Sequence, residues 1–130
     1  MRKATYVQFD ESAWIEPPGH YGGALSKLLV NPETTDTRNF DFRVSLYRPK
    51  GMVEEHVHER AEHVYYIVSG VGLFTLDGEA RVVGPRDTIF VPPGVKHQIN
   101  NTGVEDLLFI VATSPPGELP LRDGQASSGR

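Results

Sequence analysis

The sequence contains no cysteine among its 130 residues. Disulfide bonds are therefore excluded as a source of stability, and so are metal sites built on thiolate ligands. Any metal that this chain binds must be held by histidine and carboxylate side chains. The fold itself must be stabilised by packing.

Clusters of basic residues and long apolar runs are also missing. The formal net charge is −4 and no basic cluster is longer than Arg2-Lys3, which argues against nucleic acid or an anionic membrane surface as the partner. No apolar run approaches the roughly 18 residues of a membrane-spanning helix, and residues 1–14 lack the hydrophobic core of a signal peptide. We therefore expect a cytoplasmic protein that acts on a small molecule.

No stretch of the sequence has a convincing helical pattern, whereas short strands are frequent. Segments of alternating apolar and polar residues are separated by turns rich in glycine, proline and aspartate, which is typical of a sandwich or barrel. The clearest hairpin signal is the Asp77-Gly78 pair. Strands are expected at residues 6–9, 24–30, 40–47, 63–69, 73–76, 79–83, 87–91, 98–101 and 107–113. The sequence therefore predicts an all-β protein.

The length of the chain and its hydrophobic content of 38% suit one domain with a single core. We assign the domain to residues 1–113, with the core of the barrel at about 40–113. The segment 114–130 is a tail that is rich in proline, glycine and serine and has almost nothing to bury. We expect its last eight or so residues to be disordered.

Four of the five histidines lie in two short stretches, at residues 51–70 and 92–101. His56 and His58 are two residues apart, so in an extended segment both imidazoles leave the same face, roughly 6.5 to 7 Å apart at the backbone. His63, at the start of a strand, and His97, after a Pro-Gly turn, can reach the same cation from other directions. Neutral imidazole is the commonest protein ligand for such metals. The four histidines therefore predict a metal site; the alternative is a set of polar turn residues that bind nothing.

The spacing of these residues resembles the two sequence motifs of the cupin family. The first motif is matched by His56, His58, His63 and Gly70, and the second by Pro92, Gly94, His97 and Asn101. The two motifs and the chain between them cover residues 51–101. The resemblance implies a single cupin-type antiparallel β-barrel, a jelly roll or double-stranded β-helix. It also implies one divalent metal per chain, held by His56, His58, His63 and His97.

Three positions depart from the usual cupin pattern. Most cupins carry a glutamate ligand where this chain has His63, and Glu62 stands one residue before it. A shift of one residue turns a strand side chain to the opposite face, so only one of the two is expected at the metal, and we favour His63 over Glu62. Arg86 replaces a glycine expected six residues before Pro92, and Gly51 lies one residue closer to the histidines than usual.

The reaction implied by the resemblance stays open. Four neutral imidazoles leave the full charge on a divalent metal, which makes it a strong Lewis acid with positions free for a bidentate substrate. Mn, Fe, Co, Ni, Cu and Zn all suit such donors. Related cupins include dioxygenases, lyases, isomerases and polyketide cyclases. We expect a metal-dependent enzyme, first of all a dioxygenase, acting on a small oxygenated organic molecule. The alternatives are a redox-neutral lyase, isomerase or cyclase, and a non-catalytic protein that binds a sugar or an acid.

Two further residues are candidates for catalysis. Tyr65 shares a strand face with His63, and Arg43 lies in a strand with two distinct faces. A tyrosine near a cation has its pKa lowered and can act as an acid or base, and an arginine can hold a carboxylate. The alternative is barrel packing for Tyr65 and a surface position for Arg43.

The remaining expectations concern His20 and the N-terminal segment. Nothing in the sequence holds His20 near the other histidines, so we expect a solvated loop residue, with a substrate contact as the alternative. In many cupins the N-terminal segment pairs with a partner subunit, where Trp14 and Ile15 would be natural contacts; otherwise they cover the open end of the barrel. Because a barrel of this size leaves exposed edges, we expect a homodimer.

Overall fold

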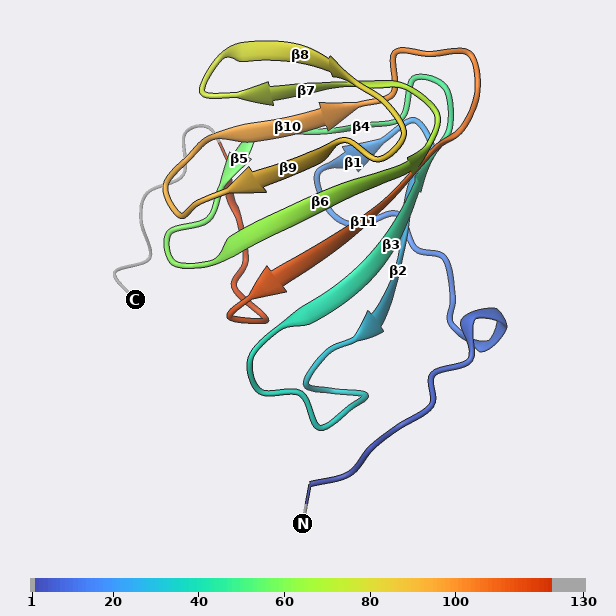
Figure 1. Cartoon of the computed structure of the whole chain (residues 1–130), viewed down its shortest axis with the longest axis vertical. Coiled ribbons are helices and arrows are strands. Elements are labelled where there is room, and N and C mark those ends of the chain that lie inside the picture. The colour runs from blue at the N-terminus through green and yellow to red at the C-terminus, as the bar shows by residue number, and fades with distance from the viewer. Residues whose placement is uncertain (1, 123–130) are drawn as a thin grey trace.

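The computed structural model describes residues 2–122, which form two antiparallel β-sheets (Figure 1). Those residues contain no α-helix, and the one helical turn is a 3-10 turn, η1, at Phe9–Glu11. The predicted all-β class is therefore confirmed. No helix between residues 2 and 122 is long and apolar enough to cross a membrane.

The first sheet has five strands in the spatial order β2, β3, β11, β6 and β9. Their bounds are Ala24–Val30 (β2), Asp41–Tyr47 (β3), Leu107–Ser114 (β11), Glu62–Ser69 (β6) and Thr88–Val91 (β9). All neighbouring pairs are antiparallel. The long strand β11 lies in the middle, between β3 and β6.

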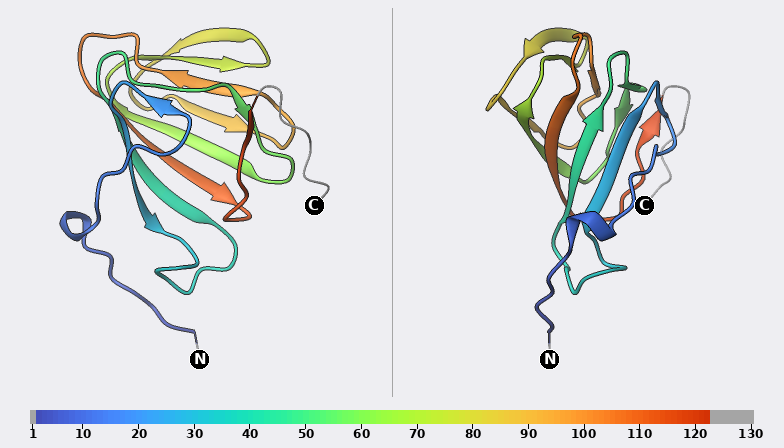
Figure 2. Two further views of the ribbon diagram at one scale, coloured as in Figure 1. Left: turned by 180° about the vertical axis from the view of Figure 1, so that it is seen from behind. Right: turned by 90° about the vertical axis from the view of Figure 1, so that its right-hand side faces the viewer.

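The second sheet is built around β10, which has β7 on one side and two short strands, β4 and β5, on the other. β7 also pairs with β8, β4 with β1, and β5 with β12. The bounds are His20–Tyr21 (β1), Met52–Val53 (β4), His56–Val57 (β5), Gly72–Leu76 (β7), Glu79–Val83 (β8), His97–Asn100 (β10) and Leu121–Arg122 (β12). Together the two sheets curl into a half-barrel, which can be followed in the two views of Figure 2.

The predicted hairpin at Asp77-Gly78 is confirmed. β7 and β8 pair up to Leu76 opposite Glu79, so the turn consists of these two residues alone. Their φ angles are 47° and 83°, which are the left-handed conformations that a two-residue hairpin turn requires. Arg86 has the same handedness, with a φ of 72°, at the position where the cupin pattern has glycine. The backbone of that turn therefore keeps a glycine-like shape although the residue has changed.

Strand β6 alternates between the interior and the exterior. His63, Tyr65 and Ile67 are buried, whereas Val64 and Tyr66 are 42% and 40% exposed. The prediction that Tyr65 and Ile67 share a face with His63 is confirmed.

The hydrophobic core lies between the two sheets. Burying one large apolar side chain completely stabilises the fold by about 1.5–3 kcal/mol. The largest fully buried side chains are Phe109, Ile67, Ile99, Leu107, His97 and Val91. A histidine among them places a polar ring deep in an apolar interior, where it needs a partner.

Strand β3 turns its more polar face inward. Asp41, Ser45 and Tyr47 are buried, whereas Phe40 on the other side is 46% exposed. The two distinct faces predicted for this strand are confirmed. Arg43 alternates in step with the buried residues, and its Nε atom is buried. The alternative of a surface position for Arg43 is therefore wrong.

The N-terminal segment does not form the strand expected at residues 6–9. Residues 2–8 pair with no strand, and the 3-10 turn begins at Phe9. The segment alternates between apolar and polar residues, but no strand between residues 2 and 122 pairs with it. Instead, the ammonium group of Lys27 lies 3.8 Å from the centre of the Phe9 ring and donates to the Phe9 carbonyl oxygen at 2.7 Å. This contact attaches the turn to β2.

The segment after β11 returns to the barrel. β12 pairs with β5, and the side chain of Glu118 is only 6% exposed. The expectation that this segment has almost nothing to bury is therefore wrong for Glu118. The last eight residues, which we expect to be disordered, lie outside the described residues. The domain boundary at residue 113 stays a prediction.

Candidate metal centre

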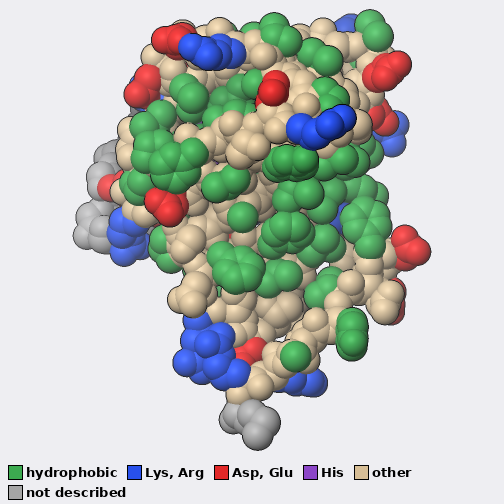
Figure 3. Space-filling model, viewed as in Figure 1, with side chains coloured by type: hydrophobic (Ala, Val, Ile, Leu, Met, Phe, Trp, Pro, Cys, Tyr) green, Lys and Arg blue, Asp and Glu red, His purple; other side chains and the backbone are tan. Residues whose placement is uncertain are grey.

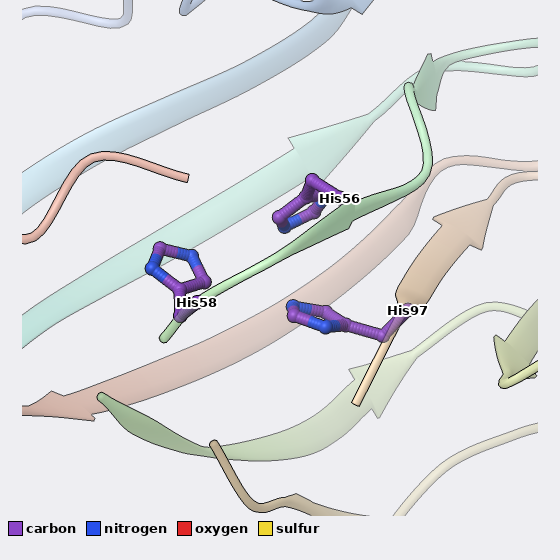
Figure 4. A group of neighbouring side chains, drawn as sticks. All are labelled: His56, His58 and His97. Carbon is purple, nitrogen blue, oxygen red and sulfur yellow. The ribbon is translucent and has the colours of Figure 1, made fainter. Parts of the chain in front are cut away.

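His56, His58 and His97 gather between the two sheets. Figure 4 shows His56 and His58 on one segment and His97 facing them from β10. His97 is the cross-strand partner of His56, and their ring centroids are 4.2 Å apart. The rings of His56 and His58 are 5.6 Å apart. One nitrogen from each of the three rings lies within 4.8 Å of the others.

This spacing fits a single transition metal. Ligand nitrogens at about 2.1 Å from a metal lie about 3 Å apart when adjacent and about 4.2 Å apart when opposite. A small inward movement of the rings therefore brings the three nitrogens of the cluster to one cation.

His63 stands beside this cluster of three histidines. Its ring centroid is 4.3 Å from that of His58 and 5.3 Å from that of His97. The Nε2 atoms of His63 and His97 are buried and have no hydrogen-bond partner. Glu62 points to the exposed face of β6. Of the two residues weighed from the sequence, His63 is thus the one that lies with the other histidines.

Hydrogen bonds to backbone oxygens fix the orientation of two of the rings. Nδ1 of His56 lies 2.7 Å from the carbonyl oxygen of Glu54, and Nδ1 of His97 lies 2.9 Å from that of Val95. A carbonyl oxygen only accepts hydrogen bonds, so Nδ1 carries the proton in both rings. The Nε2 lone pairs are then free for a metal.

Thr113 connects His63 to a buried carboxyl group. It is the cross-strand partner of both His63 and Asp41, and its Oγ1 lies 2.7 Å from Nδ1 of His63. Thr113 also hydrogen bonds to Asp41. Burial raises the pKa of Asp41, and the charge of Arg43 only partly offsets this. When the Thr113 hydroxyl donates to Asp41, its oxygen accepts Nδ1–H of His63, which again leaves Nε2 free.

Burial keeps these imidazoles uncharged. It is the largest cause that lowers the pKa of His56 to about 3 and that of His58 to about 4, and the charge of His97 lowers both further. The pKa values of His63 and His97 are also lowered, again chiefly by burial. A neutral imidazole with a free lone pair is the form that binds a metal. The donor set therefore fits a divalent transition metal.

Tyr65 lies next to the histidines, with its ring centroid 6.1 Å from that of His63 and 6.2 Å from that of His97. Burial raises its pKa well above the usual value of 10, and the charge of Arg43 offsets only part of this. This is the pKa of the metal-free chain, and the lowering expected beside a bound cation stays a prediction. At neutral pH Tyr65 offers a hydroxyl group that can donate a hydrogen bond.

Arg43 lies in the same row across the sheet as Tyr65, because Val111 of β11 pairs with Arg43 on one side and with Tyr65 on the other. Its charge lowers the pKa of His58 and of His63, so the guanidinium lies near the histidines. Within residues 2–122, no carboxylate forms an ion pair with it, and its Nε atom makes no hydrogen bond. The site therefore contains a positive charge that the described chain does not neutralise by a direct ion pair.

The expectation for His20 is wrong. This residue is half-buried in β1, opposite Val53 of β4, and its ring centroid is 6.0 Å from that of Tyr47. Burial lowers its pKa, and its charge in turn lowers the pKa of His56. The pairing of β1 with β4 joins two segments far apart in the sequence, which no local pattern indicates.

Glu118 is a residue near the site that sequence analysis missed. Its Oε1 atom lies 3.8 Å from Nδ1 of His58 and accepts a hydrogen bond from the backbone N–H of Ala61 at 2.7 Å. The residues around it, Pro115 to Gly117 and Leu119-Pro120, match no motif, so no local signal marks it.

Comparison with known proteins shows which family has these features. The family described as Cupin domain matches residues 43–113. Over 61 residues the chain is 43% identical to the uncharacterized protein MJ1618 of Methanocaldococcus jannaschii, a match that covers 47% of this chain and only 49% of that protein. Over 103 residues it is 30% identical to the Mycobacterium tuberculosis protein named Beta-D-galactosidase Rv1717, covering 78% of this chain and 87% of that protein.

The fold is similar to that of a solved structure, the polyketide cyclase RemF from Streptomyces resistomycificus. The TM-score is 0.80, and the likeness covers 97% of this chain and 89% of that one, at 22% sequence identity. At this identity the likeness shows the fold alone. The matched family, the shared fold and the histidine motifs agree. The chain therefore belongs to the cupin family, with a Cupin domain at residues 43–113 and a cluster of three histidines, His56, His58 and His97, inside its half-barrel.

Proposed function

We propose that this chain is a metal-dependent enzyme that acts on a small oxygenated organic molecule. The observation that carries the proposal is the set of buried, uncharged imidazoles that face one another between the sheets. His56, His58, His63 and His97 would hold one divalent transition metal, with His63 as the fourth ligand beside the cluster. Bound there, the metal supplies Lewis acidity to an oxygen atom of the substrate.

Arg43 gives the proposed site a preference for anions. A partly buried guanidinium without a carboxylate partner is unfavourable unless a ligand provides the negative charge. Its fork of N–H donors matches a carboxylate. The substrate is then a small carboxylic acid or enolate with one oxygen among the histidines and its anionic group at Arg43.

Tyr65 is suited to hold a proton near the reacting atoms. Its raised pKa keeps the hydroxyl protonated, so it donates a hydrogen bond to negative charge that develops on a substrate oxygen. The Tyr65 hydroxyl and the Arg43 guanidinium are two hydrogen-bond donors that can stabilise an oxyanion. This favours redox-neutral chemistry, as in a lyase, isomerase or cyclase. Two similar proteins carry the names polyketide cyclase and Beta-D-galactosidase, neither of which denotes an oxidoreductase. A dioxygenase is the second candidate, because the same nitrogen donors suit Fe, Mn, Ni and Cu.

One experiment separates these candidates. The metal content of freshly purified protein is determined, and samples loaded with Zn²⁺ or with Fe²⁺ are offered hydroxy acids, oxo acids, enols and a chromogenic β-galactoside while oxygen uptake is recorded. Turnover with Zn²⁺ and no oxygen uptake is the expected result. Oxygen uptake with Fe²⁺ alone selects the dioxygenase, and ligand binding without turnover in either sample selects a binding protein. A chain that binds no metal would overturn the proposal.

The role of Arg43 has its own test. Arg43→Met is expected to weaken the binding of oxalate, used as a probe for small carboxylates, by about tenfold or more in Zn²⁺-loaded protein, because the charge-assisted hydrogen bonds are lost. Zn²⁺ affinity should not fall. Arg81→Met, at an exposed arginine on β8, is the control. Unchanged oxalate binding in Arg43→Met counts against an anion site.

A further inference from the structure

His58 differs from the other three histidines in what faces its second ring nitrogen. The Nδ1 atoms of His56, His63 and His97 lie against neutral oxygen atoms, two carbonyls and one hydroxyl. Nδ1 of His58 is buried, has no hydrogen-bond partner within 3.5 Å, and lies 3.8 Å from Oε1 of Glu118; the backbone of Glu118 also lies near this ring and, like the carboxylate, raises the pKa of His58. Between residues 2 and 122, this is the one ion-pair contact that joins a carboxylate to any of the four histidines.

Glu118 is held in place by the turn that follows His58. Its Oε1 atom accepts hydrogen bonds from the backbone N–H groups of Ala61 at 2.7 Å and Arg60 at 3.1 Å. Oε2 lies 3.6 Å from Nε of Arg60, and the side chain is 6% exposed. Burial raises the pKa of Glu118, but the hydrogen bonds from the backbone of Ala61 and Arg60 and the charge of Arg60 lower it below its ordinary value. The carboxylate is therefore fixed and negatively charged at neutral pH.

The segment that carries Glu118 is also attached to the strand that carries His56. Strand β12 pairs with β5, which places Arg122 opposite His56. Nε of Arg122 lies 3.2 Å from Oε2 of Glu54, and Nη2 donates to the carbonyl oxygen of Pro18 at 2.8 Å. Residues 114–122 thus approach both His58, through Glu118, and His56, through Arg122. The segment is fixed before Glu118 by the pairing of Ser114 with Glu62 and after it by the pairing of β12 with β5.

We propose that Glu118 is a positioning residue of the metal centre, whose carboxylate accepts Nδ1–H of His58 and so presents Nε2 of that ring to the metal. This rests on the metal site proposed above. The distance from Oε1 to Nδ1 has to shorten by about 1 Å to reach hydrogen-bond length, which a small rotation of the imidazole achieves. A carboxylate behind a ligating histidine fixes its tautomer and makes it more basic.

The charge of Glu118 gives this arrangement a second consequence. Four neutral imidazoles leave both charges of a divalent metal unbalanced. The glutamate found among the ligands of most cupins is replaced here by His63. Glu118 restores one negative charge from behind His58, outside the ligand set, while the metal keeps four nitrogen donors.

The test compares Glu118→Gln with the wild type and with Glu79→Gln, a control at an exposed glutamate on β8. Zn²⁺ affinity is measured by competition with a chromogenic chelator at pH 7.5. Glu118→Gln is expected to bind Zn²⁺ about 10- to 100-fold more weakly, the usual effect of removing such a partner. The control should bind as the wild type does. Glutamine keeps an oxygen for the N–H of Ala61, so the melting temperature of the metal-free protein should change little.

Nitrogen-resolved NMR of the imidazoles gives a readout that does not depend on affinity or activity. In Zn²⁺-loaded wild type, His58 should carry its proton on Nδ1, with a low-field, slowly exchanging signal that moves upfield in Glu118→Gln. A wild-type chain that binds no Zn²⁺ overturns the metal site and this inference together. A wild type that binds Zn²⁺ while Glu118→Gln binds equally well overturns this inference alone. If Glu118→Gln does not fold, the wild-type spectrum decides, because a His58 proton on Nε2 is incompatible with the proposal.

Discussion

His63 decides whether the site has three or four histidine ligands. Its Nε2 atom is buried without a partner, and its Nδ1 is occupied by Thr113. We predict that His63→Ala weakens Zn²⁺ binding by about tenfold or more, because one of four nitrogen donors is lost. The measurement is a chelator competition at pH 7.5.

Glu62→Ala is the matched control for this prediction, since the two residues are neighbours on opposite faces of β6. Its Zn²⁺ affinity should equal that of the wild type. The reverse result, with affinity lost in Glu62→Ala and kept in His63→Ala, would mean that β6 is displaced by one residue from the register seen here.

At the scale of single residues, period-two alternation is what made part of the site predictable. It put His56 and His58 on one face and Tyr65 in step with His63, and both placements are present in the structure. The positions of His20 and Glu118 were not predictable, because each depends on a contact between segments far apart in the sequence. For Arg43 the sequence predicted a strand with two distinct faces but not which of them is interior. That depends on how the neighbouring strands pack.

The turn between β7 and β8 is an element whose backbone conformation alone limits the sequence. Gly78 has a φ of 83°, and nothing lies within 4 Å of a methyl group added there. Gly78→Ala should therefore lower the free energy of unfolding by about 1 kcal/mol through backbone strain alone. Urea denaturation measures this.

Gly84→Ala serves as the control for the turn. A methyl group at Gly84 also meets nothing within 4 Å, but the backbone there is not left-handed. The substitution should leave stability unchanged or raise it slightly, because the unfolded chain loses freedom. Equal destabilisation by both alanines would show that strain at the turn is not the cause.

Among the elements, those with a partner close by in the sequence were predictable. The hairpin of β7 and β8 depends on its own turn residues, and β6 on its own alternation. The segment 6–9 alternates as well, yet it forms no strand because no edge within residues 2–122 pairs with it. Strand β12 was missed for the opposite reason. Its two residues, Leu121–Arg122, show no pattern and are a strand only because β5 lies beside them.

For the whole molecule, the outer face of the five-stranded sheet leaves apolar side chains uncovered. Figure 3 shows them gathered over this sheet. Val64, Tyr66, Val68 and Phe90 are between 40% and 54% exposed, and Tyr6 in the N-terminal segment is 97% exposed. An apolar sheet face together with a fully exposed tyrosine in a neighbouring segment is typical of an interface. We propose that a second copy of the chain covers this face.

The proposal predicts a dimeric mass by light scattering at micromolar concentration. Tyr66→Lys, which places a charge in the middle of the face, should shift the protein to monomer. Val82→Lys is the control, because Val82 is 70% exposed on β8 of the other sheet, and it should stay dimeric. A monomeric wild type contradicts the proposal.

The buried histidines also make the stability of the whole molecule depend on pH. In the unfolded chain a histidine has a pKa of about 6.5, whereas folding lowers that of His56 to about 3 and that of His58 to about 4. Well above pH 6.5, by about pH 8, both groups are uncharged in both states and have almost no effect. Below it the unfolded chain binds protons that the folded chain does not, so the free energy of unfolding falls as the pH falls towards the folded values.

We therefore predict that metal-free protein melts at progressively lower temperature as the pH is lowered from 6.5 towards 4. Each of these histidines contributes a slope of up to about 1.4 kcal/mol per pH unit in that window. Asp41 has a raised pKa and so acts in the opposite direction near the acid end. Melting curves of chelator-treated protein at pH 8, 7, 6 and 5 measure the effect, and His58→Gln should make the decline shallower. Because a metal binds the folded state, adding Zn²⁺ should raise the melting temperature at pH 7. Equal melting temperatures at pH 7 and pH 5 in the metal-free wild type would mean that these histidines are not buried in their uncharged form.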